Sequence, residues 1–193
     1  MPRPIDPALR PRLLDKIVDY VRRNGVAEFS LRPLAASIGT SHRTILYHFE
    51  SREQLLCTVF DTLREAGRRE MDDCLARAAG PPRAVFRALW LWLARPEMRP
   101  TLCLFYEMYG IATRDPARFG DYPRRVAQFW LDGIGRRLRD EGIAPARADL
   151  LAGMIVAMFR GATLELAATG DAPRLTRTIE AFLDLLPFGE AAP

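Results

Sequence analysis

Hydrophobic residues recur along the chain at the three- and four-residue spacing of helices that face a core. In the first quarter this spacing predicts helices at about 12–24, 31–38 and 41–49. A long helix then begins at Ser51 and ends before Gly80, and five further helices follow at 83–95, 101–114, 122–141, 146–169 and 175–186. No strand pair and no internal repeat can be discerned. The expected fold class is therefore all-α, with about nine or ten helices.

The stretch from Ser30 to Arg52 has the pattern of two short helices joined by a tight turn. Ser30 is a suitable N-cap, and Pro33 lies in the first helical turn, where its missing N–H costs nothing. The apolar stripe of this helix ends at Gly39, the residue that most easily takes the left-handed conformation that closes a helix. Thr40 or Ser41 can cap the second helix. The stripe consists of Leu31, Leu34, Ala35 and Ile38.

The second helix of this pair carries an unusual surface for its length. Ile45 and Phe49 lie four residues apart and should face inward. The other faces hold hydroxyl, imidazole, guanidinium and phenol groups, a set that suits base edges and phosphates in a major groove. These residues are His42, Arg43, Thr44, Tyr47 and His48. The alternative is two ordinary short helices whose polar residues are only solvated.

The charge distribution favours the nucleic-acid interpretation. Residues 1–52 contain nine Lys and Arg against five Asp and Glu, whereas residues 53–193 contain nineteen of each. The whole formal charge of +4 therefore lies in the first 52 residues. A basic N-terminal segment is the electrostatic property that binding to a polyanion requires.

This stretch resembles the DNA-binding domain of the TetR family of bacterial transcriptional regulators. The likeness is sharpest from Ser30 to Leu56, in the turn I-G-T-S-x-x-T, the following Y-H-F and the S-R-E-x-L-L that opens the long helix. One difference is that the family often has Tyr at the position of Leu46, whereas Tyr comes one residue later here. The resemblance implies DNA contacts by Arg32, Ser41, His42, Arg43, Thr44, Tyr47 and His48, and a phosphate contact by Arg52.

Together these observations predict two domains. Residues 1–52 form a three-helix DNA-binding domain with a flexible arm at 1–11, and residues 53–193 form a larger helical domain for effector binding and dimerisation. The apolar runs are interrupted before membrane-spanning length, and the N-terminus lacks a signal-peptide core, so we expect a cytoplasmic protein. Three widely spaced cysteines, Cys57, Cys74 and Cys103, fit reduced thiols better than disulfides.

The sequence argues against an enzyme and against a metal or other cofactor. Its two histidines, His42 and His48, are six apart and do not share a helix face as a metal pair would. Motifs for a nucleophilic serine, a paired cysteine site or a phosphate-binding glycine loop do not occur. Two alternatives stay open: a helical enzyme or scaffold whose N-terminal helices only pack, and a regulator that responds to cysteine oxidation.

The middle of the chain is rich in aromatic residues and methionine. For any single residue core packing is the simpler explanation, but as a group they offer more bulk than a small helical core needs. The resemblance implies an effector pocket here, so we expect an apolar small molecule between the long fourth helix and the helices of 83–159. Glu107 is either a solvated residue or a buried acid that pairs a cationic ligand. The candidate lining is Trp90, Met98, Phe105, Tyr109, Phe129, Trp130 and Met158.

A single short recognition helix reads few base pairs, so we expect a homodimer that binds a palindromic operator in double-stranded DNA. The last two long helices are the candidate interface, where the family forms a four-helix bundle. The alternative is that their apolar residues only close the monomer core. The sequence thus predicts a repressor that an apolar effector releases from DNA. The candidate interface residues are Leu151, Ile155, Met158, Leu166, Phe182 and Leu186.

Overall fold

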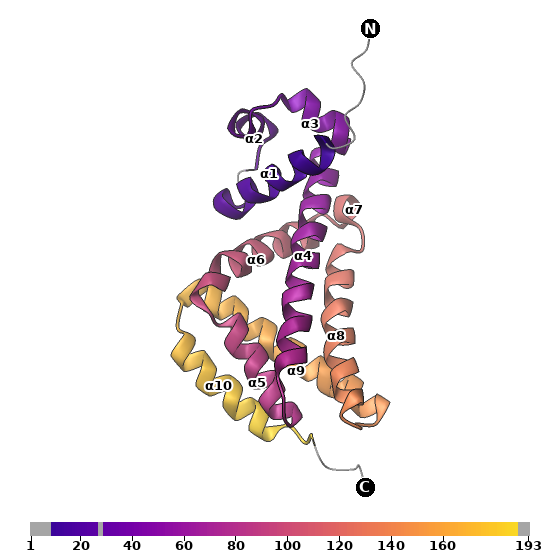
Figure 1. The fold of residues 1–193 in the computed structure, drawn as a ribbon, viewed down its shortest axis with the longest axis vertical. Coiled ribbons are helices and arrows are strands. Elements are labelled where there is room, and N and C mark those ends of the chain that lie inside the picture. Colours follow the sequence, from indigo (N-terminus) through magenta and orange to yellow (C-terminus); the bar gives the residue numbers. More distant parts are fainter. Residues whose placement is uncertain (1–8, 27–28, 189–193) are drawn as a thin grey trace. The chain divides into compact units, whose positions relative to one another are not determined.

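The structure, a computed structural model, describes residues 9–26 and 29–188. All regular elements within these ranges are helical, which confirms the expected all-α fold (Figure 1). They are α1 (Leu9–Asn24), α2 (Leu31–Ile38), α3 (His42–Phe49), α4 (Arg52–Arg77), α5 (Pro82–Leu93), the 3₁₀ turn η1 (Pro96–Met98), α6 (Arg99–Arg114), α7 (Pro116–Phe119), α8 (Tyr122–Asp140), α9 (Pro145–Thr169) and α10 (Ala172–Leu185).

Some helix bounds differ from those predicted. Helix α1 begins at Leu9, so the arm expected at 1–11 can extend no further than residue 8, and residues 1–8 lie outside the described part of the chain. The loop expected after Arg114 contains the one-turn helix α7, whose N-cap Asp115 accepts a hydrogen bond from the Arg118 backbone N–H. Hydrophobic periodicity cannot reveal a helix of a single turn.

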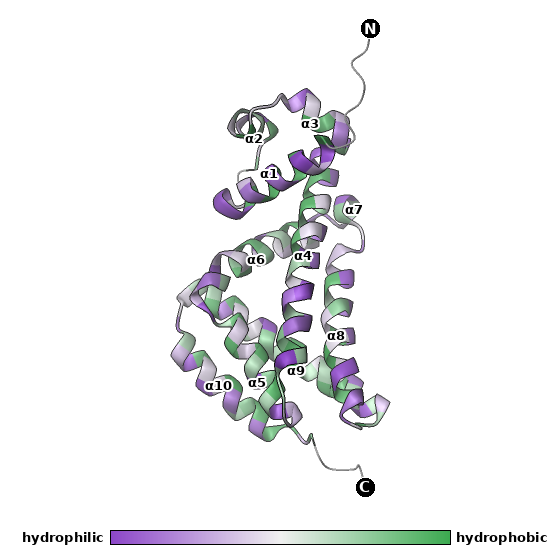
Figure 2. Cartoon of the chain, in the orientation of Figure 1, coloured by the Kyte–Doolittle hydropathy of each residue, from purple (hydrophilic) through white to green (hydrophobic). Residues whose placement is uncertain are grey.

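Packing divides the chain into two compact units, which are described separately. The first unit comprises residues 1–67 and 107–120, and the second comprises residues 68–106 and 121–193. Helix α4 therefore contributes to both units, and so does α6. Figure 2 shows a run of hydrophilic residues in the middle of α4, around the division.

The first unit has the expected three-helix core. Helix α1 places Ile17 and Val21 inside it, fully buried. Leu34 of α2 and Ile45 of α3 are also fully buried, and Phe49 is 1% exposed. A two-turn helix such as α2 or α3 is not stable alone, so this shared burial is what holds both in place.

Glu107, in the α6 segment of this unit, has a role that neither sequence interpretation anticipated. Its Oε2 accepts a hydrogen bond from the Val26 backbone N–H, 2.9 Å away, directly after the end of α1. Gly25 has a φ of 70°, and a Cβ at this position would lie 3.0 Å from the same oxygen. The half-buried Glu107 carboxylate therefore accepts a hydrogen bond from a loop N–H, and the glycine at position 25 lets the backbone approach that carboxylate closely.

In the second unit, α5 and α10 pack as an antiparallel pair in a defined register. Arg83 forms an ion pair with Asp184, which holds the pKa of that carboxyl below its ordinary value. One turn later Arg87 Nε lies 2.6 Å from Glu180 Oε1. The fully buried Trp90 then donates from Nε1 to Thr176 Oγ1 at 2.9 Å. The indole N–H is thus satisfied inside the core, as a buried tryptophan requires.

Helix α9 belongs to the second unit and packs against α8 and α10. It is long and apolar enough to cross a membrane by length and composition, with a mean hydropathy of 1.6 over its most apolar window. The sequence interpretation, which saw no such segment, underestimated this helix. Its inner face is nevertheless built into the core, where Ile155 is fully buried and Phe159 is 5% exposed. Packing within the protein explains that part of its apolar character.

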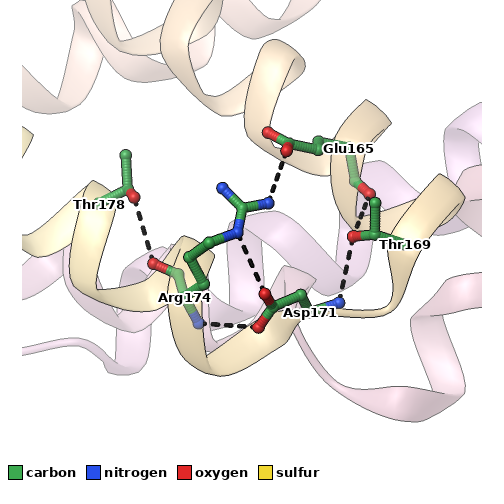
Figure 3. Close-up of polar contacts among 5 residues, drawn as sticks. All are labelled: Glu165, Thr169, Asp171, Arg174 and Thr178. Carbon is green, nitrogen blue, oxygen red and sulfur yellow. Dashed lines mark hydrogen bonds and ion pairs between the residues drawn. The ribbon is translucent and has the colours of Figure 1, made fainter.

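The turn from α9 to α10 is fixed by side chains on both helices (Figure 3). Asp171 caps α10 by accepting the Arg174 backbone N–H at 3.1 Å. The Arg174 guanidinium bridges back, with Nε 3.1 Å from Asp171 Oδ2 and Nη2 2.5 Å from Glu165 Oε1. Thr169 Oγ1 accepts from the Asp171 N–H at 3.2 Å. The two helices thereby form a hairpin whose closed end is cross-linked by polar contacts.

Candidate nucleic-acid interface

The turn between α2 and α3 is held by backbone and side-chain caps. Gly39 has a φ of 72°, and the Thr40 N–H donates to the Ala35 carbonyl at 2.9 Å while the Gly39 N–H donates to Ala36 at 3.4 Å. This is the Schellman arrangement that glycine allows at the end of a helix. Ser41, of the two residues considered, caps α3: its Oγ accepts the Thr44 N–H at 3.0 Å.

Helix α3 presents the polar surface expected of a recognition helix. Tyr47 is 67% exposed, and His42 and Arg43 are exposed as well. Thr44 and His48 are half-buried, and the Thr44 hydroxyl lies 2.8 Å from Ser41 Oγ. The Tyr47 and His48 rings contact each other edge to face, with centroids 5.1 Å apart. The exposed side carries donors, acceptors and a cation, as reading base edges requires.

Arg32, an expected DNA contact, and Arg52, the expected phosphate contact, differ in their surroundings. Arg32 is exposed on α2. Arg52, whose side chain is 37% exposed, donates from Nε to the Phe29 carbonyl at 3.1 Å, and its guanidinium carbon lies 5.6 Å from the centre of the Phe29 ring. Arg52 therefore fixes the approach to α2 as well, and its contact with a phosphate stays a prediction.

The connection from α3 to α4 is a strained turn at Glu50. This residue has φ 65° and ψ −56°, and it is the one described non-glycine residue with positive φ. The Ser51 N–H donates to the Phe49 carbonyl at 2.7 Å, which closes a three-residue γ-turn around Glu50. Gamma-turns of this hand are rare because their central residue is strained.

Two cations of α1 escaped the sequence interpretation. Arg10 donates from Nε to the His48 carbonyl at 3.2 Å, and its guanidinium carbon lies 5.1 Å from the centre of the Phe49 ring. Lys16 Nζ lies 3.4 Å from the Ile38 carbonyl oxygen. Both reach backbone oxygens far away in the sequence, and no local pattern indicates such contacts.

The residues suggested for an effector site differ in burial and are divided between the two units, with Met98, Phe129, Trp130 and Met158 packed against the core that contains Trp90. Trp90 is fully buried, bonded to Thr176 and edge-on to Phe159, so it is a core residue of the second unit. Phe129 and Trp130 of α8 are half-buried neighbours, with ring centroids 5.8 Å apart. Tyr109 belongs to the first unit. Met98, Phe105 and Met158 are half-buried in the second unit.

The three cysteines are half-buried and reduced. Burial raises the pKa of the Cys74 thiol, and the nearby Arg95 and Arg77 only partly oppose this effect. A raised pKa lowers the fraction of reactive thiolate. Within residues 9–26 and 29–188, no three His, Cys, Asp or Glu side chains gather as metal ligands.

Comparison with known proteins shows what the N-terminal part of the chain is similar to. Residues 13–58 match the family model described as bacterial regulatory proteins, tetR family. The sequence matches none of the curated proteins with which it was compared.

Solved structures share the fold over almost the whole chain. A transcriptional regulator from Rhodococcus sp. Rha1 is 16% identical, with a TM-score of 0.72 over 92% of this chain and 95% of that one. A protein from Saccharomonospora viridis in complex with choline is 20% identical, with a TM-score of 0.73 over 93% and 97%. The multidrug binding protein EbrR complexed with imidazole is 25% identical, with a TM-score of 0.66 over 97% and 95%.

Proposed function

We propose that the chain is a TetR-type transcriptional regulator, a cytoplasmic repressor that binds a palindromic operator as a homodimer; the match of residues 13–58 to the tetR family model and the shared fold support this. The observation that carries this proposal is α3, a two-turn helix with two buried apolar residues and an exposed polar, cationic face. We assign DNA reading to residues 1–52, and effector binding and dimerisation to residues 53–193.

Within the reading domain we propose separate roles for phosphate and base contacts. Arg32 and Arg52 neutralise phosphates, and Ser41 and Tyr47 contribute hydroxyl contacts at the edge of the recognition helix. His42 and Arg43 are fully available to base edges because both are exposed. Thr44 and His48, which are half-buried, approach the bases with the part of their side chains that remains exposed.

The dimer interface proposed from the sequence needs a correction. Leu151, Ile155, Leu166 and Leu186 are at most 6% exposed in the single chain, so choosing them was wrong: they close its own core. Met158 and Phe182 are half-buried. The outward face of α9 carries a different apolar stripe, at alternating spacings of four and three residues. It consists of Leu150, Met154, Ala157, Gly161, Leu164 and Ala168, all exposed.

We propose that a second copy covers this outer stripe of α9. Leu150 is 65% exposed and Leu164 is 51% exposed, and a single helix face of this kind is unfavourable in water. Replacing Leu164 by Glu would bury a charge against the partner, so the variant should be monomeric at micromolar concentration by light scattering. L91E is the control, since Leu91 is also exposed, on α5. A wild-type monomer, or a dimeric L164E, would refute this interface.

An apolar effector is the remaining part of the proposal. Its support is the group of half-buried aromatic and methionine side chains in residues 98–158. Two proteins of the same fold were solved with choline and with imidazole, respectively. A ligand that binds the DNA-incompetent state more tightly, with a coupling of about 1–3 kcal/mol, would reduce operator affinity by roughly 5- to 150-fold. A panel of apolar compounds without any thermal shift would instead indicate a constitutive DNA binder.

Selection of duplexes from a random-sequence pool, followed by a salt titration, tests the central proposal. A groove reader releases counterions, so log affinity should fall linearly with log salt, with a slope of about −0.9 per neutralised phosphate. The selected duplex should be palindromic because the protein is two-fold symmetric. Equal affinity for the selected and a scrambled duplex would overturn the assignment as a regulator.

A further inference from the structure

We propose that α1 positions the recognition helix α3, and that Arg10, assisted by Lys16, does so by binding backbone carbonyls rather than DNA phosphates. This inference rests on the proposed function, because it assigns a task to α1 within the reading domain. It implies that two cations of the basic N-terminal segment, Arg10 and Lys16, do not bind DNA phosphates.

The end of α3 shows why an additional donor is needed. The last carbonyls of a helix have no partner within the helix. The turn itself supplies two donors: the Glu50 N–H bonds to the Leu46 carbonyl at 2.8 Å, and the Ser51 N–H bonds to the Phe49 carbonyl at 2.7 Å. The carbonyl of His48, between these two, receives Arg10 Nε at 3.2 Å. Arg10 thus caps a C-terminal carbonyl that the γ-turn does not reach.

The end of α2 repeats this arrangement. Its Schellman turn satisfies the carbonyls of Ala35 and Ala36 with backbone N–H groups. The Ile38 carbonyl, at the last helical residue, is the one that Lys16 Nζ approaches at 3.4 Å. Helix α1 therefore supplies one cation to the C-terminal end of each of the two helices in the reading motif.

The electrostatics of helix ends strengthen both contacts. Aligned peptide dipoles give the C-terminus of a helix a partial negative charge, which a nearby cation stabilises. Arg10 adds a second anchor, since its guanidinium lies over the ring of Phe49, which is 1% exposed. A guanidinium held at once by a carbonyl and a buried ring is fixed in place, as a positioning group must be.

The consequence for DNA recognition follows from the size of α3. This helix has only eight residues, and two of them, Ile45 and Phe49, anchor it in the core. Loss of the Arg10 contact would allow its last turn to fray or tilt. Contacts to base edges depend on such small displacements, whereas phosphate contacts made from α2 and α4 do not. Removing Arg10 should therefore weaken specific binding far more than non-specific binding.

Three replacements of Arg10 distinguish positioning from phosphate binding. R10A removes the positive charge, the N–H donors and the planar group together. R10Q removes the charge but keeps an N–H donor, because the amide nitrogen of glutamine is the same number of bonds from Cα as the Nε of arginine. R10K keeps the charge as a point cation, which a phosphate accepts, but loses the planar group stacked on Phe49. R22A is the control: Arg22 is an exposed cation on the same helix, so it matches the loss of one positive charge.

The DNA measurement uses the duplex that the wild-type protein selects, with a scrambled duplex of equal length. For R10A we expect the affinity for the selected duplex to fall about 5- to 30-fold further than it does for R22A. The affinity for the scrambled duplex should change little, and the salt slope of R10A should equal that of R22A. R10Q should recover most of this loss. A salt slope lowered by about one relative to R22A, together with rescue by R10K but not by R10Q, would overturn the proposal in favour of a phosphate contact.

A second measurement needs no DNA and separates this inference from the proposed function. Amide hydrogen exchange of the full-length free protein should show faster exchange in the last turn of α3 for R10A, wild-type rates for R22A and intermediate rates for R10Q. Unchanged protection of α3 in R10A would refute the positioning role, whatever the protein binds. Failure to select any duplex would refute the proposed function. The hydrogen-exchange measurement would still decide whether Arg10 positions α3.

Discussion

Replacing Glu50 by glycine should stabilise the first unit. Glu50 has φ 65° in the γ-turn between α3 and α4, a conformation that costs a residue with a Cβ about 1–3 kcal/mol. Glycine adopts it without that strain, but its greater freedom in the unfolded chain offsets about 0.5–1 kcal/mol. The Glu50 side chain is exposed, so little packing is lost. The expected net gain is about 1 kcal/mol.

Hydrogen exchange at the amides of Ile45 and Phe49 measures this gain within the unit that contains the turn. The matched control is E50A, which removes the same charge but keeps the Cβ, and therefore keeps the strain. A gain in E50G that E50A does not share assigns the effect to the backbone. Equal stability of the two variants, or a less stable E50G, would show that the turn is not strained.

Three further predictions concern single side chains. E107A should cost about 1–3 kcal/mol by leaving the Val26 N–H without its acceptor, whereas E107Q keeps an acceptor and should cost less; urea unfolding distinguishes the two. R43A should change the preferred DNA sequence, at a cost of about 1–3 kcal/mol if Arg43 binds a guanine, whereas R52A should weaken binding to all duplexes alike. The duplex selection, repeated with each variant, checks this. A shift of the preferred sequence in R52A but not in R43A would contradict it. W90A should destabilise the protein by about 3–5 kcal/mol because the indole fills the core, and a loss below about 1 kcal/mol would show that the site is open enough to hold a ligand.

The sequence predicted most of the helices because their signals are local. Ser30 and Gly39 mark the ends of α2, and the structure places both at those ends, although the Ser30 side chain makes no capping hydrogen bond there. The polar face of α3 was recognisable since this helix is clearly amphipathic: Ile45 and Phe49 are its buried residues. Helix α7 was missed because its four residues are too few to show a period.

The choice of interface residues on α9 failed for a physical reason. Leu150 and Leu151 are equally apolar neighbours, yet the first is 65% exposed and the second 2% exposed. A helix that is apolar on all sides carries no periodic signal that tells its inner face from its outer one. The positions of the surrounding helices decide which residues are buried: α8 and α10 pack on α9, and so do Trp90 of α5 and Tyr106 of α6.

The contacts of Arg10, Lys16 and Arg52 could not be predicted from the sequence for a different reason. Their carbonyl partners are 38, 22 and 23 residues away along the chain. A basic residue on an exposed helix face has the same local pattern whether it binds a phosphate, a carbonyl or only water. Tertiary structure is needed to choose among these roles.

The division of the chain through α4 and α6 has a consequence for protein engineering. The first unit is discontinuous: residues 1–67 are completed by residues 107–120, which bring Glu107 to the Val26 N–H. A chimera that joins residues 1–52 to the effector domain of another regulator would leave that donor without its carboxylate and would cut a continuous helix at its first turn. A graft that changes operator specificity while preserving the host's effector response must therefore transfer two separate stretches of sequence together.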